Sequence, residues 1–260
     1  MRVSMPKTVL SPDRTRKALA LCAVLAVSAC ATSQPGGVGA DGINDPHEQA
    51  NRKVHAFNRS LDRALVRPAA RGYSTVLPDE IEDSVGDFAT NLGQPSVVVN
   101  SLLQGDLKGA GVSTARFLVN TVVGVGGLIN AADELNMPDH DTDFGETLHT
   151  WGVGEGAYVE LPGLGPSTQR DTVGKVVDLF TNPLSYTVDS PEKYYGTGAS
   201  VASRLSDRGR YSDTVDSILY ESADSYAQAR LIYLQNRRFE LGQEDASSEI
   251  DPFELDTEGF

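Results

Sequence analysis

The stretch RFLVNTVVGVGGLINAAD occupies residues 116–133 and includes sixteen consecutive uncharged residues, 117–132. As a helix rising about 1.5 Å per residue it would reach roughly 24 Å, short of the roughly 30 Å hydrocarbon core of a bilayer. Three glycines, Gly124, Gly126 and Gly127, weaken any helix here. The stretch is therefore too apolar for an ordinary surface segment and too short and interrupted for a membrane span.

The N-terminus has the layout of a secretory signal peptide. Arg14, Arg16 and Lys17 precede the apolar run ALALCAVLAVSA, and small residues follow. The end of this run, LAVSAC, resembles the lipobox of bacterial lipoproteins. We therefore expect residues 1–29 to be cleaved and Cys30 to become the lipidated first residue of the mature chain.

Lipid on Cys30 would fix the location of the protein. Diacylglycerol and an N-acyl group such as palmitate supply three acyl chains, and two or more chains are enough for stable attachment. Ala31, not aspartate, follows Cys30, as in lipoproteins exported to the outer membrane. We expect an anchor in its inner leaflet, on the periplasmic face. The other cysteine, Cys22, lies in the signal peptide, so the mature chain has no disulfide pair.

The charge balance restricts the partners. The chain carries 22 basic and 36 acidic residues, a net charge of −14. Residues 1–29 hold five basic and one acidic residue, so the mature chain has 17 against 35, or −18. Such a protein is repelled by nucleic acid and by anionic headgroups. It would engage a bilayer through acyl chains and apolar surface.

The chain divides into four parts. After the signal peptide, residues 30–43 are rich in glycine and small polar residues and are predicted to form a flexible tether. Residues 242–260 contain seven acidic residues and no basic one, which predicts a disordered tail. Residues 44–241 are long enough for one domain with a core of its own.

Helical periodicity dominates residues 44–241. We expect a first helix with Pro46 at its first position, capped by Asn44 or Asp45, and a second from about 79 to 92, ended by Gly93 and Pro95. A short helix then covers 95–103, and Asp106 caps the next. Four short helices in succession suggest a compact bundle. Further helices are predicted after a Ser167 or Thr168 cap, within 189–205, and over about 25 residues within 212–241.

The domain is predicted to be all-α, with little or no β structure. Residues 157–161, AYVEL, alternate weakly between turn residues. A single extended segment cannot form a stable sheet alone, so we interpret it as part of a structured loop.

The sequence offers little catalytic chemistry. HEQAN begins like the zinc motif H-E-x-x-H, but position 51 is asparagine. The segment from His140 to His149, HDTDFGETLH, could bind a cation weakly, although acidic residues are expected in so acidic a chain. No P-loop and no G-x-S-x-G elbow is present. We therefore expect no metal, no cofactor and no enzymatic activity.

Several motifs, in order, resemble the MlaA/VacJ outer-membrane lipoproteins, which maintain lipid asymmetry. The match runs from about residue 44 to 186. Its departures are Gln49-Ala50, where many members have Gly-Phe, and His55, where an aromatic residue is common. The matching residues include Asn44-Asp45-Pro46, Asn51-Arg52, Phe57-Asn58, Arg67-Pro68, Asn91-Leu92, Pro95, Asn100, Leu103-Gln104-Gly105, Arg116-Phe117, Asn120-Thr121, Gly124, Gly126-Gly127, residues 143–148, Trp151, Tyr158 and Arg170-Asp171.

The resemblance implies a ring-like helical domain sunk in one membrane leaflet. Such a domain encloses an amphipathic channel that withdraws phospholipids misplaced in the outer leaflet. It implies association with a trimeric porin, transfer of lipid to a soluble periplasmic carrier, and no catalysis. The alternative is a lipid-anchored periplasmic scaffold or adaptor without a channel; a periplasmic lipid hydrolase is a third possibility.

This resemblance suggests a purpose for residues 116–133. A protein that enters one leaflet needs apolar surface about half a bilayer thick, and polar backbone at that depth must be satisfied by protein or a water-lined cavity. We expect Gly124, Gly126 and Gly127 to act as a hinge or close-packing point, and Asn120, Thr121 and Asn130 to face the channel. The apolar members would face lipid or the core: Phe117, Leu118, Val122, Val123, Leu128 and Ile129. The alternative is a buried core hairpin.

Overall fold

The computed structural model describes residues 42–189 and 194–243 of the 260-residue chain. The predictions for the signal peptide, Cys30, nearly all of the tether and most of the acidic tail concern residues outside these ranges. The described part is helical apart from a two-stranded sheet, which confirms the all-α prediction.

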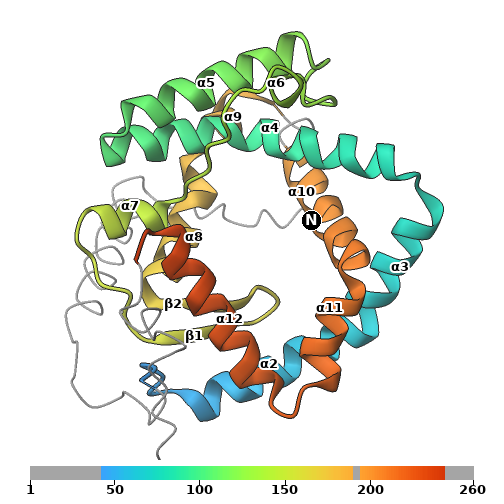
Figure 1. Cartoon of the computed structure of the whole chain (residues 1–260), viewed down its shortest axis with the longest axis vertical. Coiled ribbons are helices and arrows are strands. Elements are labelled where there is room, and N and C mark those ends of the chain that lie inside the picture. Colours follow the sequence, from blue (N-terminus) through green and yellow to red (C-terminus); the bar gives the residue numbers. More distant parts are fainter. Residues whose placement is uncertain (1–41, 190–193, 244–260) are drawn as a thin grey trace, which may run out of the picture.

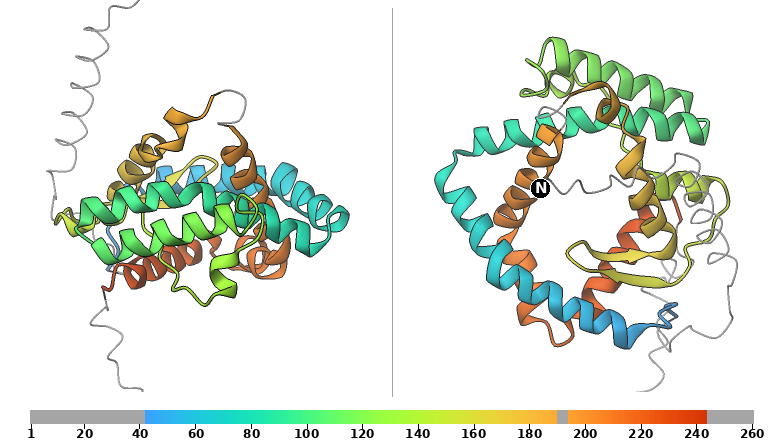
Figure 2. Two further views of the ribbon diagram at one scale, coloured as in Figure 1. Left: turned by 90° about the horizontal axis from the view of Figure 1, so that it is seen from above. Right: turned by 180° about the vertical axis from the view of Figure 1, so that it is seen from behind.

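The helices form a flat ring (Figures 1 and 2). The first half of the ring contains α2 (Glu48–Leu61), the π-helical turn η1 (Asp62–Val66), α3 (Arg67–Val76) and α4 (Asp79–Gln104), with α5 (Leu107–Val122) against the outside of α4. The short helix α6 (Ala131–Glu134) lies beside α5. The rest of the ring contains α7 (Phe144–Thr150), strands β1 (Tyr158–Leu161) and β2 (Gly165–Thr168), α8 (Gln169–Thr181), α9 (Leu184–Thr187), α10 (Tyr195–Arg210), α11 (Ser212–Asp216), η3 (Ser217–Glu221, π-helical) and α12 (Ser225–Glu240). The ring-like shape implied by the resemblance is confirmed, and the bundle of short helices is not formed.

Several helix starts follow the local capping rules. The Asp106 carboxylate accepts from the backbone N–H of Gly109 at 2.9 Å, and the Thr168 hydroxyl accepts from that of Asp171 at 3.1 Å. The sequence predicted the cap at Asp106, and Thr168 is one of the two caps, Ser167 or Thr168, that it left open for α8. Each satisfies one of the backbone donors that a helix leaves without a partner in its first turn.

The first helix begins two residues later than predicted. Neither Asn44 nor Asp45 caps it, and α2 starts at Glu48. The Asn44 amide donates instead to the carbonyl of Gly156, and the Asp45 carboxylate accepts from Asn51 and Arg230. Long-range bonds therefore use the side chains that a local cap would need.

Pro95 does not end a helix, so the prediction of two helices was wrong. Residues 79–104 form the single helix α4, which ends at Gly105 with φ = 79°. Proline lacks the N–H for the carbonyl four residues earlier, which costs one hydrogen bond. Side chains just beyond the proline bind α8: the Ser96 hydroxyl lies 2.8 Å from that of Thr181, and the Asn100 amide donates to Asp178 at 3.0 Å.

The structured loop predicted at residues 157–161 is half of a hairpin. Strands β1 and β2 pair antiparallel, Tyr158 opposite Thr168 and Leu161 opposite Gly165. An isolated two-stranded sheet is marginal. This one is held by α2, where the Asn51 side chain accepts from the N–H of Glu160 and that of Asn58 donates to the carbonyl of Leu161.

The predicted 25-residue last helix is also interrupted. Ser222 is extended, with ψ = 142°, so η3 ends at Glu221. Asp224 then caps a new helix, α12, by accepting from the N–H of Ala227. The break turns α12 back toward α2. There Arg52 of α2 binds the Asp224 carboxylate at 2.9 Å.

Candidate functional site

A large cavity lies between α4, α8 and α10. This central cavity has a volume of about 800 Å³, and residues 139–141 close one side of it. From α4 it receives Gln94 and Val97, and from α10 Arg204 and Asp207. Its size falls within the range of ligand-binding pockets, roughly 300–1,000 Å³.

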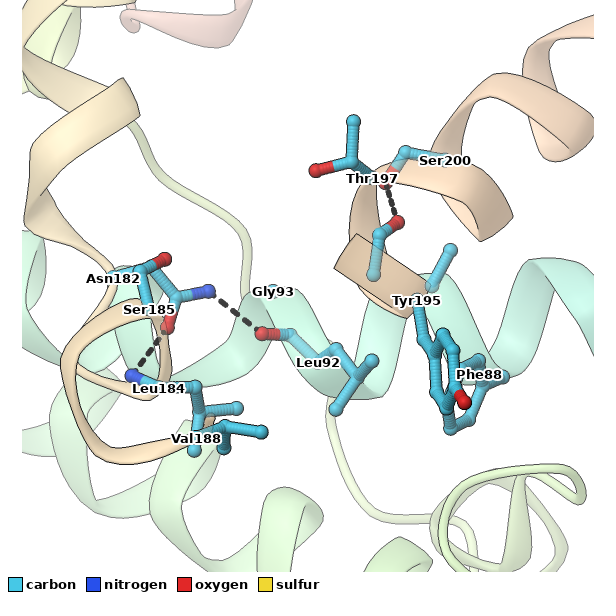
Figure 3. Close-up of a pocket in the computed structure, with 12 residues that line it drawn as sticks. Phe88, Leu92, Gly93, Asn182, Leu184, Ser185, Val188, Tyr195, Thr197 and Ser200 are labelled. Carbon is cyan, nitrogen blue, oxygen red and sulfur yellow. Dashed lines mark hydrogen bonds between the residues drawn. The ribbon is translucent and has the colours of Figure 1, made fainter. Parts of the chain in front are cut away.

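A smaller apolar pocket, about 370 Å³, adjoins the central cavity. The two share lining residues Ala89, Gly93 and Ser200. Figure 3 shows the residues that line the apolar pocket. The Asn182 amide fixes one wall, since it donates to the carbonyl of Leu92 at 2.8 Å and accepts from the N–H of Leu184. The large side chains that line the apolar pocket come from three helices. They are Phe88 and Leu92 of α4, Leu184 of α9 with Val188 just after it, and Tyr195 of α10.

A third, acidic cavity of about 420 Å³ adjoins the central one at Ser203 and Asp207. Burial raises the pKa of the Asp87 carboxyl above its ordinary value, and the nearby carboxylates of Asp133 and Asp83 raise it further. Negative charge at Asp87 is thus poorly compensated, whereas Asp83 pairs with Arg210 and Asp133 pairs with Arg116. Six carboxylates line this cavity: Glu82, Asp83, Asp87, Asp133, Glu134 and Asp207.

Residues 116–133 form the end of α5, a turn, and α6. The apolar side chains from this stretch lie mostly on the surface, with Val122 78% and Ile129 54% exposed, and Leu118, Val123 and Leu128 also exposed. Phe117 is half-buried. The stretch is therefore not a buried core hairpin in this structure.

The polar residues of the same stretch have different surroundings. Asn120 is buried, where it donates to the Asn130 side chain and accepts from the N–H of Ala132. The hydroxyl of Thr121 accepts from the Asn91 amide. Of the three residues expected to face a channel, Asn130 lines a described cavity, the acidic one.

The glycines meet different constraints. Gly126 and Gly127 have φ of 78° and 96°, in the region that favours glycine. A Cβ at Gly127 would lie 2.5 Å from the Asn91 amide nitrogen, and one at Gly124 would lie 2.1 Å from the carbonyl oxygen of Ile129. Val125 also has positive φ, 54°, which is strained for a β-branched residue and was not foreseen.

The first group of motif residues joins the two ends of the ring. Asp45 and Asn51 are buried, and the Asp45 carboxylate accepts hydrogen bonds from Asn51, Tyr226 and Arg230. Arg52 pairs with Glu48 and Asp224, which lowers the pKa of Asp224 to about 2. We call this set of contacts, which joins α2 and the segment just before it to α12, the clasp.

The remaining motif residues lie elsewhere. Pro46 lies in the turn before α2, Asn58 binds the hairpin, and Phe57 is exposed. Arg170 and Asp171 are buried at the start of α8. The Asp171 carboxylate accepts from the Tyr233 hydroxyl at 2.7 Å and lies beside Arg237, so α8 is joined to α12.

A buried ion cluster between η1 and α10 was not predicted from the sequence. Arg208 binds the Asp62 carboxylate through two hydrogen bonds of 2.8 Å and the Asp216 carboxylate through one of 2.6 Å. The Tyr220 hydroxyl donates to the same Asp62. Asp62 lies 146 positions from Arg208 in the sequence and Asp216 lies 8 positions from it, and no short motif includes them.

The two histidines of the 140–149 segment contact different groups. His140 lies 3.1 Å from the Ser101 hydroxyl, and His149 lies 3.4 Å from Arg170. Among the described residues, no three His, Cys, Asp or Glu side chains are placed to hold a metal ion. Within residues 42–189 and 194–243, no helix is long and apolar enough to cross a membrane.

The fold and the adjoining cavities define a helical ring protein with both apolar and polar cavity walls. The family model described as MlaA lipoprotein matches residues 43–240. The chain therefore belongs to the MlaA lipoprotein family, which confirms the resemblance.

Known relatives are similar over most of their length. The chain is 36% identical over 228 residues to the intermembrane phospholipid transport system lipoprotein MlaA of Escherichia coli, covering 85% of this chain and 86% of that protein. The Haemophilus influenzae protein of the same name is 32% identical, covering 85% and 88%. An uncharacterised protein of Rickettsia felis is 34% identical over 72% of this chain and 74% of its own.

A solved structure has the same fold. It is described by the words "Structural basis for maintenance of bacterial outer membrane lipid asymmetry". The superposition has a TM-score of 0.65 at 33% identity and covers 76% of this chain and 98% of that one.

Proposed function

We propose that this protein withdraws phospholipids misplaced in the outer leaflet of the outer membrane and passes them to a periplasmic carrier, and so maintains lipid asymmetry. The relatives named as intermembrane phospholipid transport lipoproteins support this function. The observation that supports it is that the apolar pocket and the central cavity lie side by side and share Ala89, Gly93 and Ser200. A phospholipid has an apolar and a polar part, and the two cavities together offer surfaces for both.

The distribution of side chains supports embedding in one leaflet. Among the described residues, ten apolar residues are buried, against twenty-four polar or charged ones. Twenty-eight large apolar side chains are exposed. Large exposed apolar surfaces mark interaction or membrane sites, and helices in lipid associate through packing and polar contacts. The exposed apolar residues near the α5–α6 turn would face lipid chains.

The anchor and partners complete the proposal. Cys30, outside the described residues, would carry diacylglycerol and an N-acyl chain in the inner leaflet. A trimeric porin would hold the ring in the outer membrane, and a soluble carrier would receive lipid on the periplasmic side. The protein would act as a passage, with phospholipid as cargo and no catalysis.

The passage can be tested by blocking it at Gly93. This residue lies in α4, lines both the apolar pocket and the central cavity, and has open space around its missing Cβ. Gly93→Phe should fill the junction while removing a helix-weakening glycine. Gly111→Phe is the matched control, because Gly111 also lies in a helix with open space and lines none of the described cavities.

The measurement is outer-leaflet phospholipid in cells whose only copy is the variant. Gly93→Phe should raise it toward the level of cells lacking the protein, and Gly111→Phe should leave it at the wild-type level. Wild-type asymmetry with a folded Gly93→Phe protein would favour the adaptor. Release of fatty acid from phospholipid by the purified protein would instead indicate a hydrolase.

A further inference from the structure

The central and acidic cavities have an uneven charge. Asp139, Asp141, Asp178 and Asp207 line the central cavity, and the acidic cavity adds five more carboxylates. The arginines lining the two cavities are Arg204 and Arg210. Arg210 is already paired with Asp83 at 2.6 Å. Arg116, which lines neither cavity, pairs with Asp133 at 2.7 Å and with Asp139 at 3.5 Å. The nine carboxylates still outnumber these three arginines. An anionic ligand that enters this space therefore meets net repulsion, and a cationic group meets attraction.

Two buried acceptors in these walls have no hydrogen-bond partner among residues 42–189 and 194–243. Gln94, 4% exposed, lines the central cavity, and its side-chain oxygen has none. Glu82, 3% exposed, lines the acidic cavity; its Oε2 accepts from Ser206, but its Oε1 has no partner. A buried acceptor without a donor costs roughly 1–3 kcal/mol, so both atoms are suited to a ligand that brings N–H groups.

A metal ion does not fit this donor set. Calcium takes six to eight oxygens at about 2.3–2.6 Å, which requires side chains that converge on one point. No such group exists among the described residues. Carboxylates and an amide oxygen that do not converge on one point instead suit a larger organic cation. Such a cation is attracted over several ångströms and donates hydrogen bonds in more than one direction.

The central cavity also offers a cation for a phosphate. Arg204 on α10 is exposed, lines this cavity, and forms no ion pair with any described residue. A guanidinium binds phosphate through two parallel hydrogen bonds. Arg204 and Asp207 are three residues apart on one helix, so a phosphate and a neighbouring ammonium could be bound on the same face.

We propose that the joined central and acidic cavities select a zwitterionic headgroup, with its phosphate at Arg204 and its ammonium against Asp207, Gln94 and the neighbouring carboxylates. Phospholipids whose headgroup carries only the phosphate charge are disfavoured. This inference rests on the proposed function, because it assumes that phospholipid enters these cavities.

The test is a competition between two headgroups. The full lipidated chain, purified in non-ionic detergent, is incubated with equal amounts of phosphatidylethanolamine and phosphatidylglycerol that have identical acyl chains. After repurification, both retained lipids are quantified by mass spectrometry. We expect severalfold enrichment of phosphatidylethanolamine, which falls at high salt because screening weakens exposed charges.

The variants separate the two recognition elements. Asp207→Asn should reduce the enrichment about two- to fivefold, the range for one partly exposed ion pair. Gln94→Leu should also reduce it. Arg204→Gln should lower retention of both lipids, since both carry phosphate. Asp213→Asn is the control, because Asp213 is an exposed carboxylate on α11 that lines none of the described cavities. Circular dichroism verifies that each variant is folded.

The outcomes distinguish this inference from the proposed function. Equal retention of the two lipids, unaltered by Asp207→Asn or Gln94→Leu, would overturn the headgroup selection and leave lipid binding intact. Preference for phosphatidylglycerol would overturn it as well. Retention of neither lipid would overturn the proposed function and this inference together.

Discussion

Arg230 donates a hydrogen bond to the Asp45 carboxylate at 2.7 Å, although the two residues are 185 positions apart. Both are at least nine-tenths buried, and Asp45 also accepts from Tyr226 and Asn51. The bond joins the segment before α2 to α12, so the clasp closes the ring at its two ends. We therefore expect the shape of the cavities to depend on this polar contact, although neither residue lines any of the three cavities.

We predict that Asp45→Asn destabilises the protein by about 3 kcal/mol. Removing one partner of a buried ion pair typically costs about 3–5 kcal/mol, and the isosteric amide preserves the shape. Denaturant unfolding in detergent, followed by circular dichroism, measures the change. The exposed control Asp213→Asn should stay within about 0.5 kcal/mol of wild type. An unchanged midpoint for Asp45→Asn would show that the clasp does not hold the ring closed.

The glycine turn gives a second prediction. Gly126→Ala should cost about 1–2 kcal/mol, because its φ of 78° is left-handed but the space around it is open. Gly127→Ala should cost more, since its φ is 96° and the new Cβ would also clash with Asn91. Gly111→Ala, in the helix α5, should instead stabilise by up to about 1 kcal/mol. Equal losses of stability for Gly126→Ala and Gly127→Ala would contradict the expected clash between the new Cβ at position 127 and Asn91.

The larger change Gly127→Val tests whether this turn matters for transport. The Asn91 side chain that it would displace binds Thr121 and extends from α4, the helix that lines the cavities. We expect a folded variant with raised outer-leaflet phospholipid. Wild-type asymmetry in a folded protein carrying both Gly126→Val and Gly127→Val would leave the turn with a purely structural role.

Local sequence rules predicted most of the helices, but not where helices continue, break or pack against distant segments. The spacing of apolar residues and the caps at Asp106 and Thr168 follow from contacts within one or two turns. Pro95 shows where the rules fail, because Ser96 and Asn100 bind α8 about 80 residues away and hold α4 continuous across it. The hairpin likewise depends on Asn51 and Asn58 of α2, more than 100 positions distant.

The candidate site was predicted only in part. The uncharged, glycine-containing stretch 117–132 predicted an exposed apolar surface. Residues such as Val122 and Ile129 form that surface in the structure. The cavities could not be foreseen, because Gln94, Asp178 and Arg204 come from three helices and none belongs to a motif of known chemistry. Only the folded ring brings them together.

Acid should weaken the contact between α8 and α12. Burial alone would raise the pKa of Asp171, but the Tyr233 hydrogen bond and the charges of Arg237 and Arg170 hold that pKa below its ordinary value. A lowered folded-state pKa contributes stability above the unfolded value of about 3.9, and this stability is lost as the pH falls through the folded pKa. Unfolding midpoints measured from pH 6 to pH 2 should fall, and Asp171→Asn should be less stable at pH 6 with a shallower fall. Parallel profiles would contradict a stabilising Asp171 carboxylate.

Asp87 should behave in the opposite way, because burial and the carboxylates of Asp133 and Asp83 raise its pKa in the folded protein. A raised carboxyl pKa opposes folding at pH values above the folded pKa, and the penalty disappears below the unfolded value of about 3.9, where both states are protonated. Asp87→Asn should therefore raise the unfolding midpoint at pH 7 and leave it unchanged near pH 3. It should also weaken the preference for a zwitterionic headgroup, since it removes one charge from the acidic cavity. A protein that is more stable but less selective would show that this carboxylate serves recognition at a cost in stability; a less stable variant at pH 7 would mean that Asp87 is a structural partner instead.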